Sequence, residues 1–226
     1  MENASVFIVI PAYNEAAVIE SVLQKLLAAN YFNIVVVDDC SRDRTGEIVK
    51  NYPVFYLRHI INRGQGAALR TGTDFARQQG AQVIVHFDAD GQMSVEDIAR
   101  FVEHVNAGRD VVLGSRFMAG SEVIQMPWHR KLLLTGAKVF NLVVLGVNYS
   151  DPQNGFRALS RQAAERLRWK NDRMAHNSEI LRLIKTERLP YQEIPVKINY
   201  SEYSLKKGQS FKDVWKIIWD LFINKF

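Results

Sequence analysis

Two aspartates, Asp88 and Asp90, follow a largely apolar run in the middle of the sequence. The run, Val83–Phe87, is rich in β-branched residues and predicts a buried strand. Residues two apart on an extended chain point to the same side, so the two carboxylates would repel each other. A hard divalent cation would neutralise them, and Mg²⁺ usually binds one or two carboxylates together with substrate phosphates. Gly91 permits a tight turn or a close ligand, and Gln92 offers an amide oxygen. Taken alone, such a pair also fits an acidic strand end that faces water.

The elements that must position this pair alternate along the first half of the chain. Apolar runs predict strands, and apolar residues at helical spacing predict helices between them. This alternation predicts an α/β fold with a mostly parallel central sheet and helices on both faces. Ligands of such sheets bind beyond the carboxyl ends of the strands. Four polar motifs follow predicted strands at these ends: Pro11–Glu15, Asp38–Asp39, Gly64–Gly66 and Asp88–Gln92.

The composition excludes several classes of protein. The 226 residues and 47% hydrophobic composition suit one domain with a single core. The net charge of +5 fits anionic ligands or an anionic membrane surface, but no Lys/Arg run is long enough to indicate nucleic-acid binding. The single cysteine, Cys40, predicts a reducing, cytoplasmic compartment. The histidines lack the spacing of zinc ligands. The turn Pro11–Glu15 lacks the glycines of a dinucleotide-binding fingerprint.

Six motifs carry a resemblance to a known family. Four of them resemble, in this order, the family-2 inverting glycosyltransferases of the GT-A fold: Val9–Glu15, Val37–Asp43, Asn62–Ala67 and Asp88–Gln92. Two more are similar to the branch of dolichyl-phosphate mannose synthase and related polyprenyl-phosphate glycosyltransferases: Asp151–Arg157 and Tyr203–Ser210. The resemblance covers nearly the whole chain. It implies a single catalytic domain over residues 1–226, with a nucleotide-binding half (1–114), an acceptor-binding half with a flap (115–210) and a C-terminal amphipathic helix (211–226).

The resemblance implies a donor site around the acidic pair. The nucleotide pocket would be lined by Pro11, Ala12, Tyr13 and Glu15. Asp38 or Asp39 would hold the base or ribose, with a loop-capping role as the alternative for one of them. Asp88, Asp90 and Gln92 would ligate Mg²⁺ or Mn²⁺ that bridges the donor diphosphate. Gly64 and Gly66 would let the backbone approach the ligand closely, or form a simple turn.

The resemblance also implies an acceptor site. The acceptor phosphate would meet Ser115, Arg116 and Arg130, although a solvated Arg130 is an open alternative. Lys207 and Ser210 would belong to a flap that closes on the diphosphate, or to a solvated basic loop. Asp151 would orient or assist the reacting groups, or cap the turn at Pro152. Glu179 lies where related hydroxyl-glycosylating enzymes place a general base. Neither Asp151 nor Glu179 receives a firm chemical role from the sequence.

The implied reaction is the inverting transfer of one sugar from a nucleotide sugar, GDP-mannose or UDP-hexose, to a polyprenyl phosphate. A phosphate acceptor is already anionic and needs no general base. The enzyme would work at the cytoplasmic face of the membrane, through its own surface or a membrane subunit. Trp215 and Trp219 of the C-terminal helix would anchor it there or pack on the core. Glu165, placed before Arg168-Trp169, departs from the signature of processive polysaccharide synthases. Three alternatives stay open: transfer to a sugar or protein hydroxyl, nucleotide-sugar binding without turnover, and nucleotidyl transfer.

Overall fold

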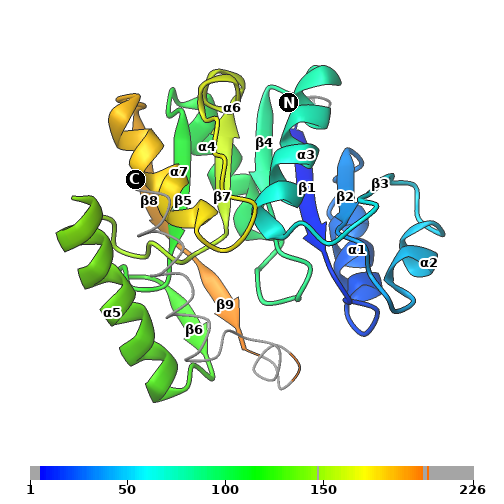
Figure 1. The fold of residues 1–226 in the computed structure, drawn as a ribbon, viewed down its shortest axis with the longest axis horizontal. Coiled ribbons are helices and arrows are strands. Elements are labelled where there is room, and N and C mark those ends of the chain that lie inside the picture. Colours follow the sequence, from blue (N-terminus) through cyan, green and yellow to red (C-terminus); the bar gives the residue numbers. More distant parts are fainter. Residues whose placement is uncertain (1–5, 147, 201–202, 204–226) are drawn as a thin grey trace.

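The computed structural model describes residues 6–146, 148–200 and 203, so the predicted C-terminal helix and the flap residues Lys207 and Ser210 lie outside the described residues. The described chain forms a seven-stranded sheet in the order β3-β2-β1-β4-β7-β5-β8 (Figure 1). The strands of this sheet are β1 (Val6–Ala12), β2 (Ile34–Asp38), β3 (Phe55–Arg58), β4 (Val83–His86), β5 (Val111–Ser115), β7 (Arg157–Ser160) and β8 (Tyr191–Pro195). All pairs are parallel except those of β7. The expected mostly parallel α/β sheet is therefore confirmed.

Helices cover both faces of the sheet. The apolar side chains of β1 alternate between the two faces, with Ile8 in one core cluster and Val9 in the other. The first cluster includes α1 (Ile19–Ala28), α2 (Thr45–Val49) and α4 (Asp97–Asn106). The second includes α3 (Gln65–Gln78), α6 (Arg161–Arg166) and α7 (His176–Thr186). Because the central strands are buried on both sides, they read as continuous apolar runs.

Strand β7 brings the second half of the chain to the edge where β4 and β5 end. It runs antiparallel between them, and Ala158 pairs with Val85 on one side and Val112 on the other. An antiparallel strand begins where its neighbours end, so the residues just before β7 lie beside those just after β4 and β5. Asp151–Phe156 consequently joins the polar motifs of the first half.

The remaining elements lie at one end of the sheet. Helix α5 (Trp128–Leu145) and the two-stranded sheet of β6 (Glu122–Ile124) and β9 (Lys197–Asn199) are opposite the end that carries α1 and α2 (Figure 1). Trp128 and Val143 on α5 are exposed, at 79% and 75% of their surface. Within the described residues, α5 included, no helix combines the length and the apolar character needed to cross a membrane.

Candidate active site

The acidic pair lies in the turn that follows β4. Gly91 has a φ of +73°, a left-handed conformation that favours glycine, so the chain reverses directly after Asp90. The Gln92 amide donates to Oδ1 of Asp90 at 3.0 Å. Oδ1 of Asp88 accepts a hydrogen bond of 2.9 Å from Nε2 of Gln65, the first residue of α3. The side-chain amide of a helix N-terminus therefore orients one of the two carboxylates.

The electrostatics of Asp88 suit a bound cation. Burial raises the pKa of the Asp88 carboxyl, and the negative charges of Asp90 and Glu15 act in the same direction, whereas Arg157 and Gln65 lower it; together they bring this pKa to about 7. Three carboxylates thus act on one small region, and a divalent cation would remove their repulsion. Within the described part of the chain, no group of three or more His, Cys, Asp or Glu side chains is arranged to hold a metal ion by itself. Asp88 and Asp90 match the one or two carboxylates with which Mg²⁺ is bound when substrate phosphates complete its shell.

Two residues at or just before the start of β7, Gly155 and Arg157, lie near the Asp88 carboxylate. Neither is among the site residues expected from the sequence. A Cβ on Gly155 would lie 2.8 Å from Oδ2 of Asp88, so a side chain there would displace the carboxylate. Arg157 is fully buried, donates to the carbonyl of Gly155 at 3.2 Å and also bonds the amide oxygen of Asn177. Burial lowers the pKa of Arg157 to about 10, and the nearby Asp88 opposes this shift. Their only signal in the sequence is their place in the motif Asp151–Arg157.

The expected nucleotide pocket begins at the end of β1. Pro11 and Ala12 are buried in the strand, whereas Tyr13 is partly exposed. Glu15 is nearly buried, and its Oε2 accepts a hydrogen bond of 3.0 Å from the hydroxyl of Tyr203. Tyr203 also donates to the carbonyl of Asn14 at 3.2 Å. Burial, with the negative charge of Glu15, raises the pKa of Tyr203. The first residue of the expected flap motif therefore lies against the donor side.

Asp38 and Asp39 are enclosed by their own loops. Asp38 accepts from the Ser41 amide and the Tyr56 hydroxyl, both at 2.7 Å, and is fully buried. Asp39 accepts from Nδ1 of His59 at 2.6 Å, and from the amides of Arg63 and Gly64 at 2.9 and 2.6 Å. These contacts are those of loop-capping carboxylates, and a contact with a base or ribose would have to share or replace them.

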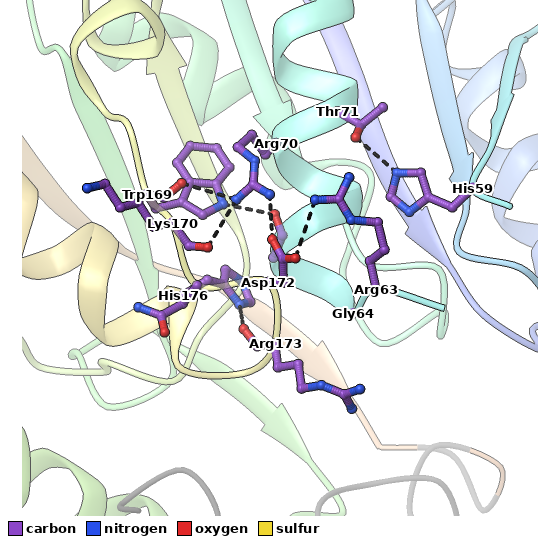
Figure 2. Close-up of polar contacts among 12 residues, drawn as sticks. His59, Arg63, Gly64, Arg70, Thr71, Trp169, Lys170, Asp172, Arg173 and His176 are labelled. Atoms are coloured by element: carbon purple, nitrogen blue, oxygen red, sulfur yellow. Dashed lines mark hydrogen bonds and ion pairs between the residues drawn. The ribbon is translucent and has the colours of Figure 1, made fainter. Parts of the chain in front are cut away.

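The glycines Gly64 and Gly66 admit a neighbouring segment of the same chain. A Cβ on Gly64, where φ is +111°, would lie 2.5 Å from the carbonyl oxygen of Asp172. A Cβ on Gly66 would collide with the carbonyl oxygen of Asn171. Figure 2 shows this segment lying across the start of α3, with the Trp169 indole directed at the helix. The need for glycine at these positions is thus explained by backbone packing within the protein.

On the acceptor side, Arg116 and Asp151 form a closed ion pair. Nε and Nη2 of Arg116 donate to Oδ2 and Oδ1 of Asp151 at 2.6 and 2.7 Å, and Nη1 donates to the Tyr200 hydroxyl at 2.9 Å. Burial alone would lower the pKa of Arg116, but the Asp151 charge raises it, so the guanidinium stays charged. The hydroxyl of Ser115 accepts from the Ser150 hydroxyl at 2.6 Å. Arg130 lies on α5, and its side chain is outside the described part of the structure.

Glu179, on α7, is also engaged by the protein. Its carboxylate accepts from the Lys170 amide at 3.0 Å and from the amide and side chain of Asn171 at 2.8 and 2.6 Å. Both carboxylate oxygens are occupied by these donors. The structure thus brings Asp88, Asp90 and Glu15 together, and it surrounds Asp151 and Glu179 with donors of the chain itself.

Comparisons with known proteins identify the family of the chain. The model of the family described as Glycosyl transferase family 2 matches residues 7–168. An uncharacterized protein of Methanocaldococcus jannaschii is 38% identical over 223 residues, which cover 97% of this chain and 92% of that protein. The UDP-N-acetylglucosamine–dolichyl-phosphate N-acetylglucosaminyltransferase of Methanococcus voltae is 34% identical over 247 residues, covering 100% of this chain and 98% of that enzyme.

Among solved structures, glucosyl-3-phosphoglycerate synthase from Mycobacterium tuberculosis, in complex with Mn²⁺, UDP-glucose and phosphoglyceric acid, superimposes with a TM-score of 0.67. The sequences are 18% identical, and the match covers 94% of this chain and 75% of that one. This likeness shows the fold, while the sequence relatives and the family model show the family. The chain therefore belongs to glycosyl transferase family 2 and is a glycosyltransferase of the GT-A fold.

Proposed function

We propose that the enzyme transfers one sugar, with inversion, from a nucleoside-diphosphate sugar to a polyprenyl phosphate, and that it needs Mg²⁺ or Mn²⁺. The observation that carries the proposal is the burial of Asp88 beside two other carboxylates, Asp90 and Glu15, and burial together with these charges raises the pKa of Asp88 to about 7. The relative from Methanococcus voltae is named for the transfer of N-acetylglucosamine to dolichyl phosphate. The structural neighbour from Mycobacterium tuberculosis was solved with Mn²⁺ and UDP-glucose. The first supports a nucleotide-sugar donor and a lipid phosphate acceptor, and the second supports a metal ion beside the nucleotide donor.

The chemistry follows from charge. The diphosphate leaving group gains negative charge as the bond to the sugar breaks, and a divalent cation held by Asp88, Asp90 and Gln92 supplies the compensating positive charge. Gln65, Gly155 and the buried charge of Arg157 keep Asp88 in place. The segment Pro11–Glu15, continued by Tyr203, forms the wall for the nucleotide.

The acceptor site uses positioning in place of proton removal. A lipid phosphate attacks as an anion, so the site must hold it and screen its repulsion from the donor. Arg116 is a buried guanidinium kept charged by Asp151. The Asp151 carboxylate already binds two nitrogens of the Arg116 guanidinium. The acceptor phosphate would therefore compete with Asp151 for Arg116. In this proposal Asp151 preorients Arg116, while Ser115, Arg130, Lys207 and Ser210 complete the phosphate contacts.

The proposal places α5 at the membrane. Four apolar side chains, Trp128, Leu132, Val139 and Val143, recur at intervals of four or seven residues and are more than half exposed. They share one face of the helix, with Lys131 exposed beside them. A helix face that combines apolar side chains with a neighbouring basic residue suits the interface of an anionic bilayer. The acceptor would then be taken from the cytoplasmic leaflet without leaving it.

The direct test is an assay with labelled donors. The purified chain is incubated with Mn²⁺ and labelled UDP-N-acetylglucosamine, UDP-glucose or GDP-mannose, and the acceptor is either dolichyl or undecaprenyl phosphate or, in parallel, a sugar alcohol. We expect label to enter the lipid fraction with one donor and EDTA to abolish the transfer. Asp90→Asn should reduce the rate at least ~100-fold, as expected for a lost group that stabilises transition-state charge. Glu103→Gln, a change on the exposed face of α4, is the matched control and should leave it unchanged. Label recovered only on sugar alcohols, or undiminished transfer in EDTA, would refute the proposal.

A further inference from the structure

The segment 169–175, between α6 and α7, crosses the start of α3 (Figure 2). The Trp169 indole donates to the carbonyl of Gly66 at 2.9 Å, and the amide of Ala67 donates to the carbonyl of Asp172 at 3.0 Å. Arg70 adds a hydrogen bond of 3.2 Å to the Trp169 carbonyl and an ion pair with Asp172. The segment is thus fixed to the first turns of α3 by backbone and side-chain contacts.

The other end of this connection is Glu179. Its buried carboxylate accepts hydrogen bonds from the backbone amides of Lys170 and Asn171. These bonds fix the path of the backbone just before Asp172. An ionised carboxylate that accepts backbone N–H bonds forms charge-assisted hydrogen bonds, which are stronger than neutral ones. Removing it would leave these donors without their partner, and the segment would lose its fixed position.

The contact between the segment and α3 leaves little free space. The carbonyl oxygens of Asn171 and Asp172 occupy the positions that side chains at Gly66 and Gly64 would take. Gln65 lies between these two glycines and donates to Asp88 at 2.9 Å. A shift of the segment therefore moves the backbone on either side of Gln65, and with it the amide that orients Asp88.

We infer that Glu179 is a positioning residue for Asp88, which acts through the segment 169–175 and Gln65. The inference rests on the proposed function in one respect, that Asp88 holds the cation. It gives Glu179 a role different from that of a general base: both of its oxygens already accept hydrogen bonds from the chain, and a phosphate acceptor attacks as an anion and so needs no general base.

The test measures Mn²⁺ binding by electron paramagnetic resonance in the presence of UDP, without any acceptor. We expect Glu179→Ala to weaken Mn²⁺ binding about tenfold, since a hydrogen bond to a charged group is worth that factor or more. Glu179→Gln, which keeps one acceptor oxygen, should weaken it less. Glu187→Ala is the matched control, because Glu187 follows the same helix and pairs with Arg166 at the surface. It should bind Mn²⁺ as the wild type does.

A double-mutant cycle separates positioning from general loss of stability. If Glu179 acts through Gln65, Gln65→Ala and Glu179→Ala should be strongly non-additive in Mn²⁺ affinity, whereas a general loss of stability would add to the Gln65 effect. A crystal structure of Glu179→Ala should show the bond between Gln65 and Asp88 lengthened or lost. Additive effects, or an intact bond with native Mn²⁺ affinity, would overturn the inference. Neither readout requires sugar transfer, so a failure of the proposed function on lipid phosphate would leave this result interpretable.

Discussion

At the scale of single residues, the carboxylates of this enzyme divide by the donors that they face. Asp39, Asp151 and Glu179 accept several hydrogen bonds each from the chain, and these bonds fold a loop, hold Arg116 and fix the segment 169–175. Asp88 is different because it is buried and its neighbours include two other carboxylates; burial first, and then these charges, raise its pKa. A carboxylate satisfied by the protein organises structure, while one crowded by like charge is prepared for an external cation.

The buried groups behind Asp88 predict an unusual dependence of stability on pH. Burial, aided by Arg157, lowers the pKa of His176 to about 3, so between pH 6.5 and 4.5 the unfolded state binds a proton that the folded state rejects. Stability therefore falls as the pH falls, by at most about 1.4 kcal/mol per pH unit for this group. Burial also lowers the pKa of His86, which acts in the same direction. Asp88, with its pKa raised to about 7, acts oppositely, because the folded state takes up its proton first.

Two substitutions should move this pH dependence in opposite directions. His176→Asn removes the proton uptake of the unfolded state, so we expect the loss of stability on acidification to be about 1 kcal/mol per pH unit smaller. Asp88→Asn removes the opposing term and should make the loss steeper by a similar amount. Urea unfolding in EDTA from pH 4.5 to 6.5 measures both slopes. Parallel curves for the wild type and His176→Asn would show that His176 is protonated in the folded state.

At the scale of elements, the strands could be predicted from sequence because each central one is a continuous apolar run. Their order could not, because the insertion of β7 between β4 and β5 depends on pairing between segments far apart in the chain. Strand β6 has only three residues, too few to show a strand pattern in the sequence, and it is not among the predicted strands. The acidic edge of the site could be predicted from residue types and spacing. Its supports, Gln65, Gly155 and Arg157, could not, because they matter only through contacts that the fold creates.

The packing of α3 on the sheet gives a prediction about two glycines. Replacing a helical glycine by alanine usually stabilises a helix, by up to about 1 kcal/mol. A Cβ on Gly72 would collide with the buried side chain of Val9 on β1, so α3 and the sheet would have to separate. We expect Gly72→Ala to destabilise the protein by about 1–3 kcal/mol, the usual range for an overpacked core.

Gly136 provides the matched comparison for Gly72. It lies within α5, and a Cβ there would have no neighbour within 4 Å, so Gly136→Ala should be neutral or stabilising. Urea midpoints of both variants measure the difference. If Gly72→Ala were as stable as Gly136→Ala, the close contact between α3 and β1 would be refuted.

At the scale of the whole molecule, the acceptor side of the site and the apolar face of α5 belong to the same half of the chain. Ser115 ends β5, Arg116 follows it, and the chain then passes through β6 to α5. Lys185 of α7 donates to the carbonyl of Gly146, just after α5, at 2.5 Å, so the helix is tied to the element that carries Glu179. The residue that would bind the lipid phosphate, Arg116, therefore lies shortly before, in the sequence, the helix that we place at the membrane.

The exposed apolar face of α5 should bind the membrane directly. Trp128 and Val143 are exposed near opposite ends of α5, and burying either in a lipid interface would contribute roughly 1.5–3 kcal/mol. Trp128→Glu and Val143→Glu should each weaken binding to vesicles of phosphatidylcholine and phosphatidylglycerol at least about tenfold. Phe32→Glu is the control, because Phe32 is also exposed but lies between α1 and β2, at the opposite end of the sheet from α5 (Figure 1). It should bind vesicles normally. Sedimentation with vesicles measures binding, and a thermal shift with UDP and Mn²⁺ confirms that the donor site is intact. Equal vesicle binding by all three variants would exclude α5 as the membrane contact, because a negative charge introduced at either end of its apolar face would then have had no effect.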